Sequence, residues 1–279
     1  MCLSMASFIA NDCLVKYVSE SLPGPQLIFI RGLFSSIFLF AAATATGALS
    51  AASAPGDGAM SPWKDRRVLL RSVLDAFATM VYLTSLFHLP LGNATAINMS
   101  TPLIITLMAA VALRERVGRT RWIAIAVGFA GVLLVVQPAA NGFNAWALLC
   151  LTGAVLGAAR DLLTRTIRAN VPTVLITLAT AVATSLLAGL AAATQTWEPV
   201  SLPQFGLLAV AGVFLSIGYY LLIVSLRAGE ISVTSPFRYT ALLFALLIGW
   251  AVWGDVPNAL AWAGIALLVG AGLHMLRGR

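Results

Sequence analysis

Apolar runs of roughly 18 to 25 residues recur along the whole 279-residue chain, and this feature limits what the chain can fold into. A helix needs about 20 mainly apolar residues to cross the hydrocarbon core of a bilayer. Only 10% of the residues are charged, against about a quarter in a soluble domain. The runs lack two-residue alternation and are about twice the length of a barrel strand. The sequence therefore predicts an all-α, polytopic membrane protein.

Ten transmembrane segments are predicted, and many of the connections between them contain proline or glycine. The segments are residues 3–18, 26–49, 69–88, 92–113, 121–138, 144–168, 172–194, 204–226, 231–252 and 258–276. The longest connection, about residues 50–68, is too short for a soluble domain. We therefore expect the whole chain to consist of the helical bundle.

The basic residues are distributed unequally between the two sides of this bundle. With the N-terminus in the cytoplasm, the inner loops and the C-terminal tail hold thirteen Lys and Arg residues, and the outer side holds Lys16. Cytoplasmic loops carry such an excess of positive charge. We therefore expect both termini to be cytoplasmic, in a bacterial-type inner membrane. The net charge of +7 is explained by this topology, and we expect no nucleic-acid partner.

Several polar residues and prolines recur 137 to 149 residues further along the chain. The pairs are Asp12 with Asp161, Lys16 with Arg165, Pro23 with Pro172, Tyr82 with Tyr219, and Glu115 with Asp255. We interpret residues 1–138 and 144–279 as two copies of a five-helix unit. An odd number of spans inverts the second copy, a plan common in secondary transporters that hold substrate near the membrane midplane. Chance similarity between helices rich in Ala, Leu and Gly is the alternative.

Two acidic residues lie well inside their predicted spans. An unpaired charge at the bilayer centre costs at least about 2.5–3.5 kcal/mol, so such residues usually face a bundle interior or an aqueous cavity. We interpret Asp12 and Asp161 as cavity-facing, and as candidates for binding substrate or a coupling proton. Because Lys16 and Arg165 follow them at i,i+4, an intrahelical ion pair is the alternative for each.

Three arginines within the spans are candidates for binding an anionic group. Arg31 could instead extend to the lipid headgroups. Arg160 lies beside Asp161 and far from the end of its span. Arg238 follows Pro236 inside the ninth segment, where a proline frees a backbone carbonyl that neighbours or cavity water must satisfy. Pairing with a carboxylate is the alternative for Arg238.

The remaining candidates are one carboxylate and three tyrosines. Asp75 is a third possible coupling group, although Arg71 at i,i+4 could simply neutralise it. Tyr82, Tyr219 and Tyr239 could offer hydroxyls and stacking faces to a ligand. Placement in the interfacial aromatic belt is the alternative for the tyrosines.

Several catalytic motifs are missing from the sequence. It contains no GxxxxGK[ST], no HExxH, no GxSxG and no Cys/His metal spacing. We therefore expect no ATP-driven motor, no metal, no cofactor and no enzymatic activity.

Four stretches resemble a known family: Asn11-Asp12 with Lys16, the run PQLIFIRG at 25–32, RDLLTR at 160–165 and PFRYT at 236–240. With ten spans and an inverted repeat, the chain resembles the EamA-type branch of the drug/metabolite transporter superfamily over essentially its whole length. The resemblance implies movement of small organic metabolites through a central cavity by alternating access. Proton coupling, exchange and facilitated movement all occur in that family.

The expected protein is thus a monomeric inner-membrane secondary transporter for an amino acid or a related zwitterionic or anionic solute. Arg31, Arg160 and Arg238 are expected to bind the anionic group of the solute, and Asp12 or Asp161 its amine or a coupling proton. A membrane receptor or scaffold without transport, and a membrane-embedded enzyme, are the alternatives. The sequence leaves open the solute, the direction of transport and the coupling.

Overall fold

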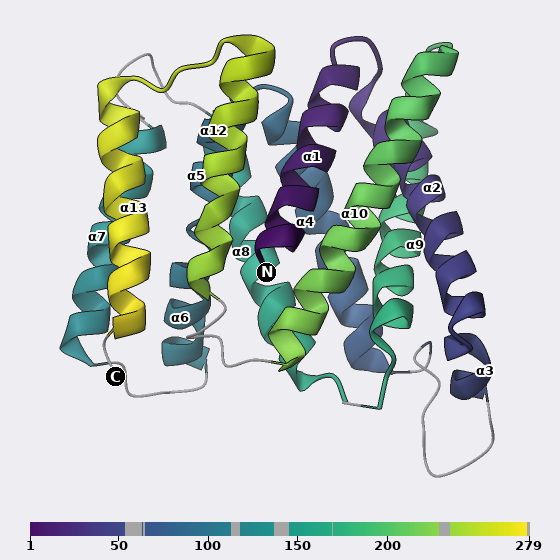
Figure 1. Cartoon of the computed structure of the whole chain (residues 1–279), viewed down its shortest axis with the longest axis horizontal. Coiled ribbons are helices and arrows are strands. Elements are labelled where there is room, and N and C mark those ends of the chain that lie inside the picture. The colour runs from purple at the N-terminus through teal and green to yellow at the C-terminus, as the bar shows by residue number, and fades with distance from the viewer. Residues whose placement is uncertain are drawn as a thin grey trace.

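The computed structural model describes residues 1–53, 63, 65–112, 118–136, 145–168, 170–228 and 235–277, and all regular structure in these residues is helical. The helices stand beside one another with roughly aligned axes (Figure 1). They are α1 (Cys2–Val18), α2 (Gly24–Ala45), α3 (Ala48–Ser53), α4 (Arg66–Leu86), α5 (Leu91–Asn98), α6 (Thr101–Ala112), α7 (Arg119–Val136), α8 (Ala145–Thr166), α9 (Thr173–Ala192), α10 (Leu202–Ala228), the 3-10 helix η2 (Ser235–Tyr239), α12 (Thr240–Trp253) and α13 (Ala259–Arg277).

The lengths and apolar character of these helices are those of a multi-pass membrane protein. Five of the described helices, α2, α4, α8, α9 and α10, are each long and apolar enough to cross a membrane. Three shorter apolar stretches lie within α7, in η2 with α12, and within α13. The all-α prediction is thus confirmed for the part of the chain that the structure describes.

Three predicted segments differ from the observed helices. The segment 231–252 begins in the structure with the 3-10 helix η2, and its residues 231–234 lie outside the described residues. The segment 26–49 is too long, because α2 ends at Ala45 and Gly47 adopts a left-handed φ of 69° before α3 begins. The segment 92–113 divides into α5 and α6, because Pro102 has no N–H to offer the carbonyl of Asn98. The hydroxyl of Thr101 donates to that carbonyl instead, at 2.6 Å.

Helices from before and after residue 140 pack against each other throughout the bundle. α1 packs on α10, α4 on α8, α2 on α9 and α7 on α13. The last pair lies side by side at the left of Figure 1. A Cβ on Gly131 would lie 2.6 Å from the carbonyl oxygen of Gly264, so α7 and α13 touch at the level of their backbones. Small residues permit such close contact between helices in membranes.

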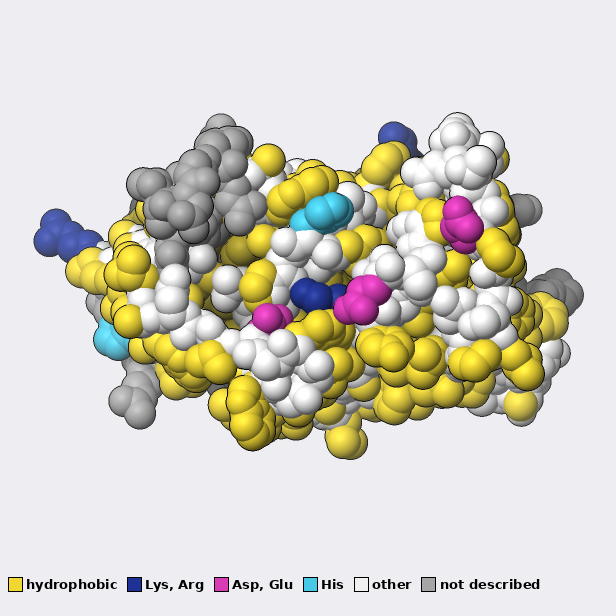
Figure 2. Space-filling view, turned by 90° about the horizontal axis from the view of Figure 1, so that it is seen from above, with side chains coloured by type: hydrophobic (Ala, Val, Ile, Leu, Met, Phe, Trp, Pro, Cys, Tyr) yellow, Lys and Arg dark blue, Asp and Glu magenta, His cyan; other side chains and the backbone are white. Residues whose placement is uncertain are grey.

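The upper ends of the helices in Figure 1 are tied together by polar contacts. Lys16 donates to the carbonyl of Leu89 and lies 5.4 Å from the ring centroid of Trp253, which in turn donates to Glu20 at 3.0 Å. The face at this end carries a basic side chain near its centre, set between acidic side chains (Figure 2). These contacts join the end of α1 to the α4–α5 turn and to the end of α12.

Candidate functional site

A cavity of about 130 Å³ lies in the middle of the bundle. Its wall draws on α1, α2, α4, α5, α6, α8, α10, η2 and α12. Six of the predicted site residues line it: Asp12, Arg31, Tyr82, Arg160, Tyr219 and Arg238. The other three, Asp75, Asp161 and Tyr239, lie behind the wall. The structure thus gathers two-thirds of the predicted residues at one polar surface inside an apolar bundle.

Asp12 on α1 is held by neutral donors. The hydroxyl of Tyr82 donates to its Oδ2, and the side-chain amide of Asn11 donates to its Oδ1, each at 2.9 Å. Among the described residues no Lys, Arg or His nitrogen lies within 4.0 Å of this carboxylate. Lys16 instead bonds to the carbonyl of Leu89. The alternative of an Asp12–Lys16 ion pair is therefore wrong.

Arg31 on α2 points inward and has 1% of its surface exposed. Its Nη1 donates to Oδ1 of Asn11 at 3.2 Å, while its Nε and Nη2 have no hydrogen-bond partner. No carboxylate in the described residues lies within 4.0 Å of it. The alternative in which Arg31 extends to the headgroups is therefore wrong. Arg31 is a buried cation positioned by a neutral amide.

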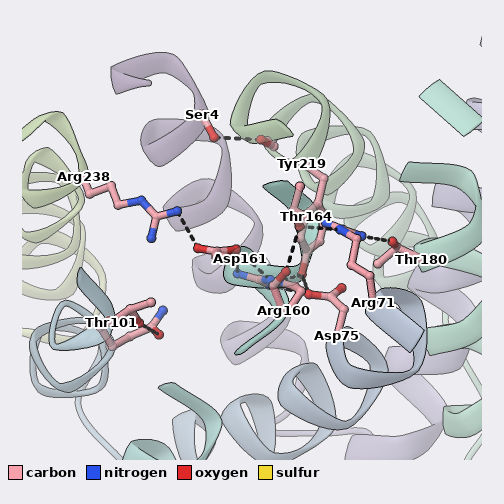
Figure 3. Close-up of polar contacts among 12 residues, drawn as sticks. Ser4, Arg71, Asp75, Thr101, Arg160, Asp161, Thr164, Thr180, Tyr219 and Arg238 are labelled. Carbon is pink, nitrogen blue, oxygen red and sulfur yellow. Dashed lines mark hydrogen bonds and ion pairs between the residues drawn. The ribbon is translucent and has the colours of Figure 1, made fainter. Parts of the chain in front are cut away.

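Asp161 on α8 has the opposite surroundings (Figure 3). Its Oδ1 lies 2.9 Å from Nη2 of Arg160, and its Oδ2 lies 2.6 Å from Nη2 of Arg238. Only 1% of Asp161 is exposed. Both oxygens are therefore ion-paired, and the pairing joins α8 to η2.

Asp75 on α4 belongs to the same network. Arg160 pairs with its Oδ1, and the hydroxyl of Tyr219 donates to that oxygen at 3.0 Å (Figure 3). The expected alternative partner, Arg71, bonds instead to Thr164 and Thr180. Arg160 thus bridges two carboxylates on two helices, and both of these acids are shielded from the cavity.

Tyr239 packs away from the cavity, against α13. A Cβ on Gly272 would lie 2.0 Å from its hydroxyl oxygen, which is buried without a hydrogen-bond partner. The Tyr239 ring therefore fits against α13 only because Gly272 has no side chain. The contact explains why Tyr239 does not share the cavity wall with its neighbour Arg238.

Two polar residues at the site were missing from the sequence-based site prediction. Asn11 links Asp12 to Arg31 through its side-chain amide. The sequence could have indicated this residue, because the repeat offset of 149 aligns Asn11 with the predicted site residue Arg160. Arg71 was considered only as an alternative partner of Asp75, yet it has 1% of its surface exposed and contacts α8 and α9. Its spacing of four residues from Asp75 places both on one face of α4.

A cavity lined by both apolar and ionised side chains, inside an apolar helical bundle, is typical of a membrane transport protein. The EamA-like transporter family matches residues 1–137 and 144–276, and this chain belongs to that family.

Similar proteins include three bacterial transporters. A riboflavin transporter of Rhizobium johnstonii is 31% identical over 77% of this chain and 70% of its own. A pseudopaline exporter of Pseudomonas aeruginosa is 27% identical over 99% and 94%. An S-adenosylmethionine uptake transporter of Rickettsia bellii is 25% identical over 98% and 91%.

The fold is also shared with a solved protein. A crystal structure that is 19% identical covers 98% of this chain and 94% of its own, with a TM-score of 0.69. At that identity the likeness concerns the fold alone.

Proposed function

We propose that this protein is a secondary transporter that moves a small organic metabolite through the central cavity by alternating access. The observation that carries the proposal is the cavity itself, whose wall combines charged and phenolic side chains from helices on both sides of residue 140. Ionisable residues inside a membrane are costly and usually mark substrate or ion pathways. The named relatives move riboflavin, S-adenosylmethionine and pseudopaline, which supports a metabolite as the solute.

The proposed topology has ten spans arranged as an inverted repeat of two five-helix units. In it α5 with α6, and η2 with α12, each count as one span. The helix packing supports this proposal, because each main contact between two helices has a counterpart when every helix is replaced by its equivalent in the other unit. The contact of α1 with α10 becomes that of α8 with α4, and the α2–α9 and α7–α13 contacts map onto themselves. The excess of basic residues in the inner loops supports cytoplasmic termini in a bacterial inner membrane.

The proposed roles divide the site residues into two groups. Asp12, Arg31, Tyr82 and Tyr219 line the cavity and contact the solute, and Asp12 carries a coupling proton or binds an amine. Arg160 and Arg238 also reach the wall, where their charges are shared with carboxylates behind it. Asp161 and Asp75 therefore act through the arginines that they hold. Because both units lie in one chain, a monomer is sufficient for transport.

A receptor or scaffold without transport is the rival proposal. It differs from a transporter in having no need to expose the cavity to the two sides in turn. A single cysteine placed on the cavity wall distinguishes the two. In a transporter its labelling from each side of sealed vesicles changes when solute is added, and in a receptor labelling stays restricted to one side.

Counterflow into proteoliposomes tests the proposal directly. The purified full chain is supplied in turn with riboflavin, S-adenosylmethionine, amino acids and phosphorylated metabolites, and protein-free liposomes are the control. We expect one class of solute to exchange, with loss of exchange in the Arg238→Ala and Asp161→Asn variants. Normal exchange by both variants would contradict the assigned site, and no exchange by folded wild-type protein would contradict transport of these solutes.

A further inference from the structure

The ionisable groups that are buried or half-buried around the cavity do not balance in charge, and Arg160 is the half-buried member. In the described residues they comprise four guanidinium groups and three carboxylates, namely Arg31, Arg71, Arg160, Arg238, Asp12, Asp75 and Asp161. Asp65 is buried as well, but it caps the first turn of α4 at the end of that helix. When all seven groups are ionised, the site holds one excess positive charge. A buried charge without a counter-ion is strongly unfavourable, so the site favours an anion.

Of these four cations, Arg31 is the one that lines the cavity with no carboxylate of the described residues within 4.0 Å, since Asp12 is joined to it only through the Asn11 amide. Arg160 and Arg238 are paired with carboxylates, and Arg71 donates to two threonine hydroxyls and does not line the cavity. Arg31 lines the cavity and has a single hydrogen bond, made by Nη1. Its Nε and Nη2 are buried without an acceptor.

These two nitrogens form the two-pronged edge of the guanidinium, which matches the paired oxygens of a carboxylate or phosphate. Asn11 keeps this edge free. Its Oδ1 accepts from Arg31 and its Nδ2 donates to Asp12, so the amide orients the cation without neutralising it. In the second unit Arg160 occupies the position equivalent to Asn11, and it pairs directly with Asp161.

We infer that the solute is an organic anion whose carboxylate or phosphate binds the Nε–Nη2 edge of Arg31, with Asn11 as the residue that positions this edge. The inference rests on the proposed transport function and narrows it, since a net anion is favoured over a zwitterion, a neutral solute or a cation.

Matched solutes that differ in charge test this selectivity. We would measure binding to the full chain in nanodiscs for indole-3-propionate, tryptophan and tryptamine, and separately for riboflavin 5′-phosphate and riboflavin. The two sets distinguish a carboxylate from a phosphate. We expect the anion to bind most tightly within at least one set. If the anion is not the tightest binder in either set, whether the zwitterion, the cation or the neutral compound binds more tightly or neither anion binds, the inference is overturned.

Variants then assign the anion site to Arg31. Arg31→Lys keeps the charge but removes the two-pronged edge, and Asn11→Asp introduces a carboxylate that pairs with Arg31. We expect each to weaken binding of the preferred anion on the order of tenfold or more. Arg227→Lys is the matched control, a half-buried arginine on α10 that bonds to Val171 and Thr173 and does not line the cavity, and it should leave the affinity within about twofold. Unchanged affinity in folded Arg31→Lys and Asn11→Asp proteins would overturn the inference.

Counterflow with the same solutes separates this inference from the transport proposal. If neutral or cationic solutes exchange equally well in wild-type and Arg31→Lys protein, transport stands and the anion site is wrong. If anions bind at Arg31 but no solute exchanges, the site stands and the transport proposal is wrong.

Discussion

Asp12 on α1 and Asp161 on α8 are both acidic residues inside helices of the bundle, 149 residues apart, yet their surroundings differ. Asp12 accepts hydrogen bonds from a phenol and an amide and lines the cavity. Asp161 is ion-paired through both oxygens with Arg160 and Arg238 and lies behind the wall. The difference begins at the preceding residue, which is Asn11 on α1 and Arg160 on α8. One carboxylate therefore borders the cavity with neutral partners, whereas the other is enclosed by arginines.

The largest expected effect comes from removing the paired carboxylate. Asp161→Asn leaves Arg238 without its counter-ion in a buried site, and breaking such a pair costs about 3–5 kcal/mol. The matched variant Asp12→Asn breaks no ion pair within 4.0 Å among the described residues and weakens hydrogen bonds to neutral partners, so it should cost about 1 kcal/mol. Unfolding midpoints of the two purified variants measure this difference. Equal loss of stability in the two variants would contradict the conclusion that Asp161 is ion-paired and Asp12 is not.

A smaller effect is expected from the tyrosine that holds Asp12. Tyr82→Phe removes the hydroxyl that donates to Oδ2 of Asp12 and should lower the exchange rate on the order of tenfold, about the effect of one hydrogen bond to a charged group. Tyr239→Phe is the control, because its hydroxyl has no partner and faces α13. That variant should exchange solute at the wild-type rate. A greater loss in Tyr239→Phe than in Tyr82→Phe would contradict the assignment of the cavity wall.

The smallest effect is expected at Lys16. Because Lys16 bonds to Leu89 and not to Asp12, Lys16→Met should leave solute affinity within about twofold. It should lower the free energy of unfolding by about 1 kcal/mol, the net contribution of one hydrogen bond. A tenfold change in solute affinity would indicate that Lys16 and Asp12 interact after all.

The helices could be predicted from sequence because they depend on local properties. Apolar runs of membrane-spanning length located the helical segments, whereas the break between α5 and α6 was missed inside the predicted segment 92–113. The end of α2 was placed wrongly because Gly47 lies within an otherwise apolar run, and its left-handed conformation is visible only in the structure.

The choice of ionic partners could not be predicted in the same way. For Asp12 and Asp75 the i,i+4 spacing suggested ionic partners on the same helix. In the structure Asp12 accepts a hydrogen bond from Tyr82 on α4, and Asp75 forms an ion pair with Arg160 on α8. Asp75 and Arg160 are 85 residues apart, and only the packing of α4 on α8 brings them together. The packing of Tyr239 depends likewise on space that Gly272 leaves on α13. The local sequence around each residue does not indicate these contacts, because the partners are far apart in the chain.

We propose that Asp12 is the carboxylate available to a coupling ion, and uptake driven by a pH gradient tests this proposal. Wild-type and Asp12→Asn proteins would be compared in proteoliposomes, with and without the gradient, at equal amounts of folded protein. We expect the gradient to stimulate uptake by the wild type, and we expect Asp12→Asn to exchange solute but to lose this stimulation. Undiminished stimulation in Asp12→Asn would contradict it.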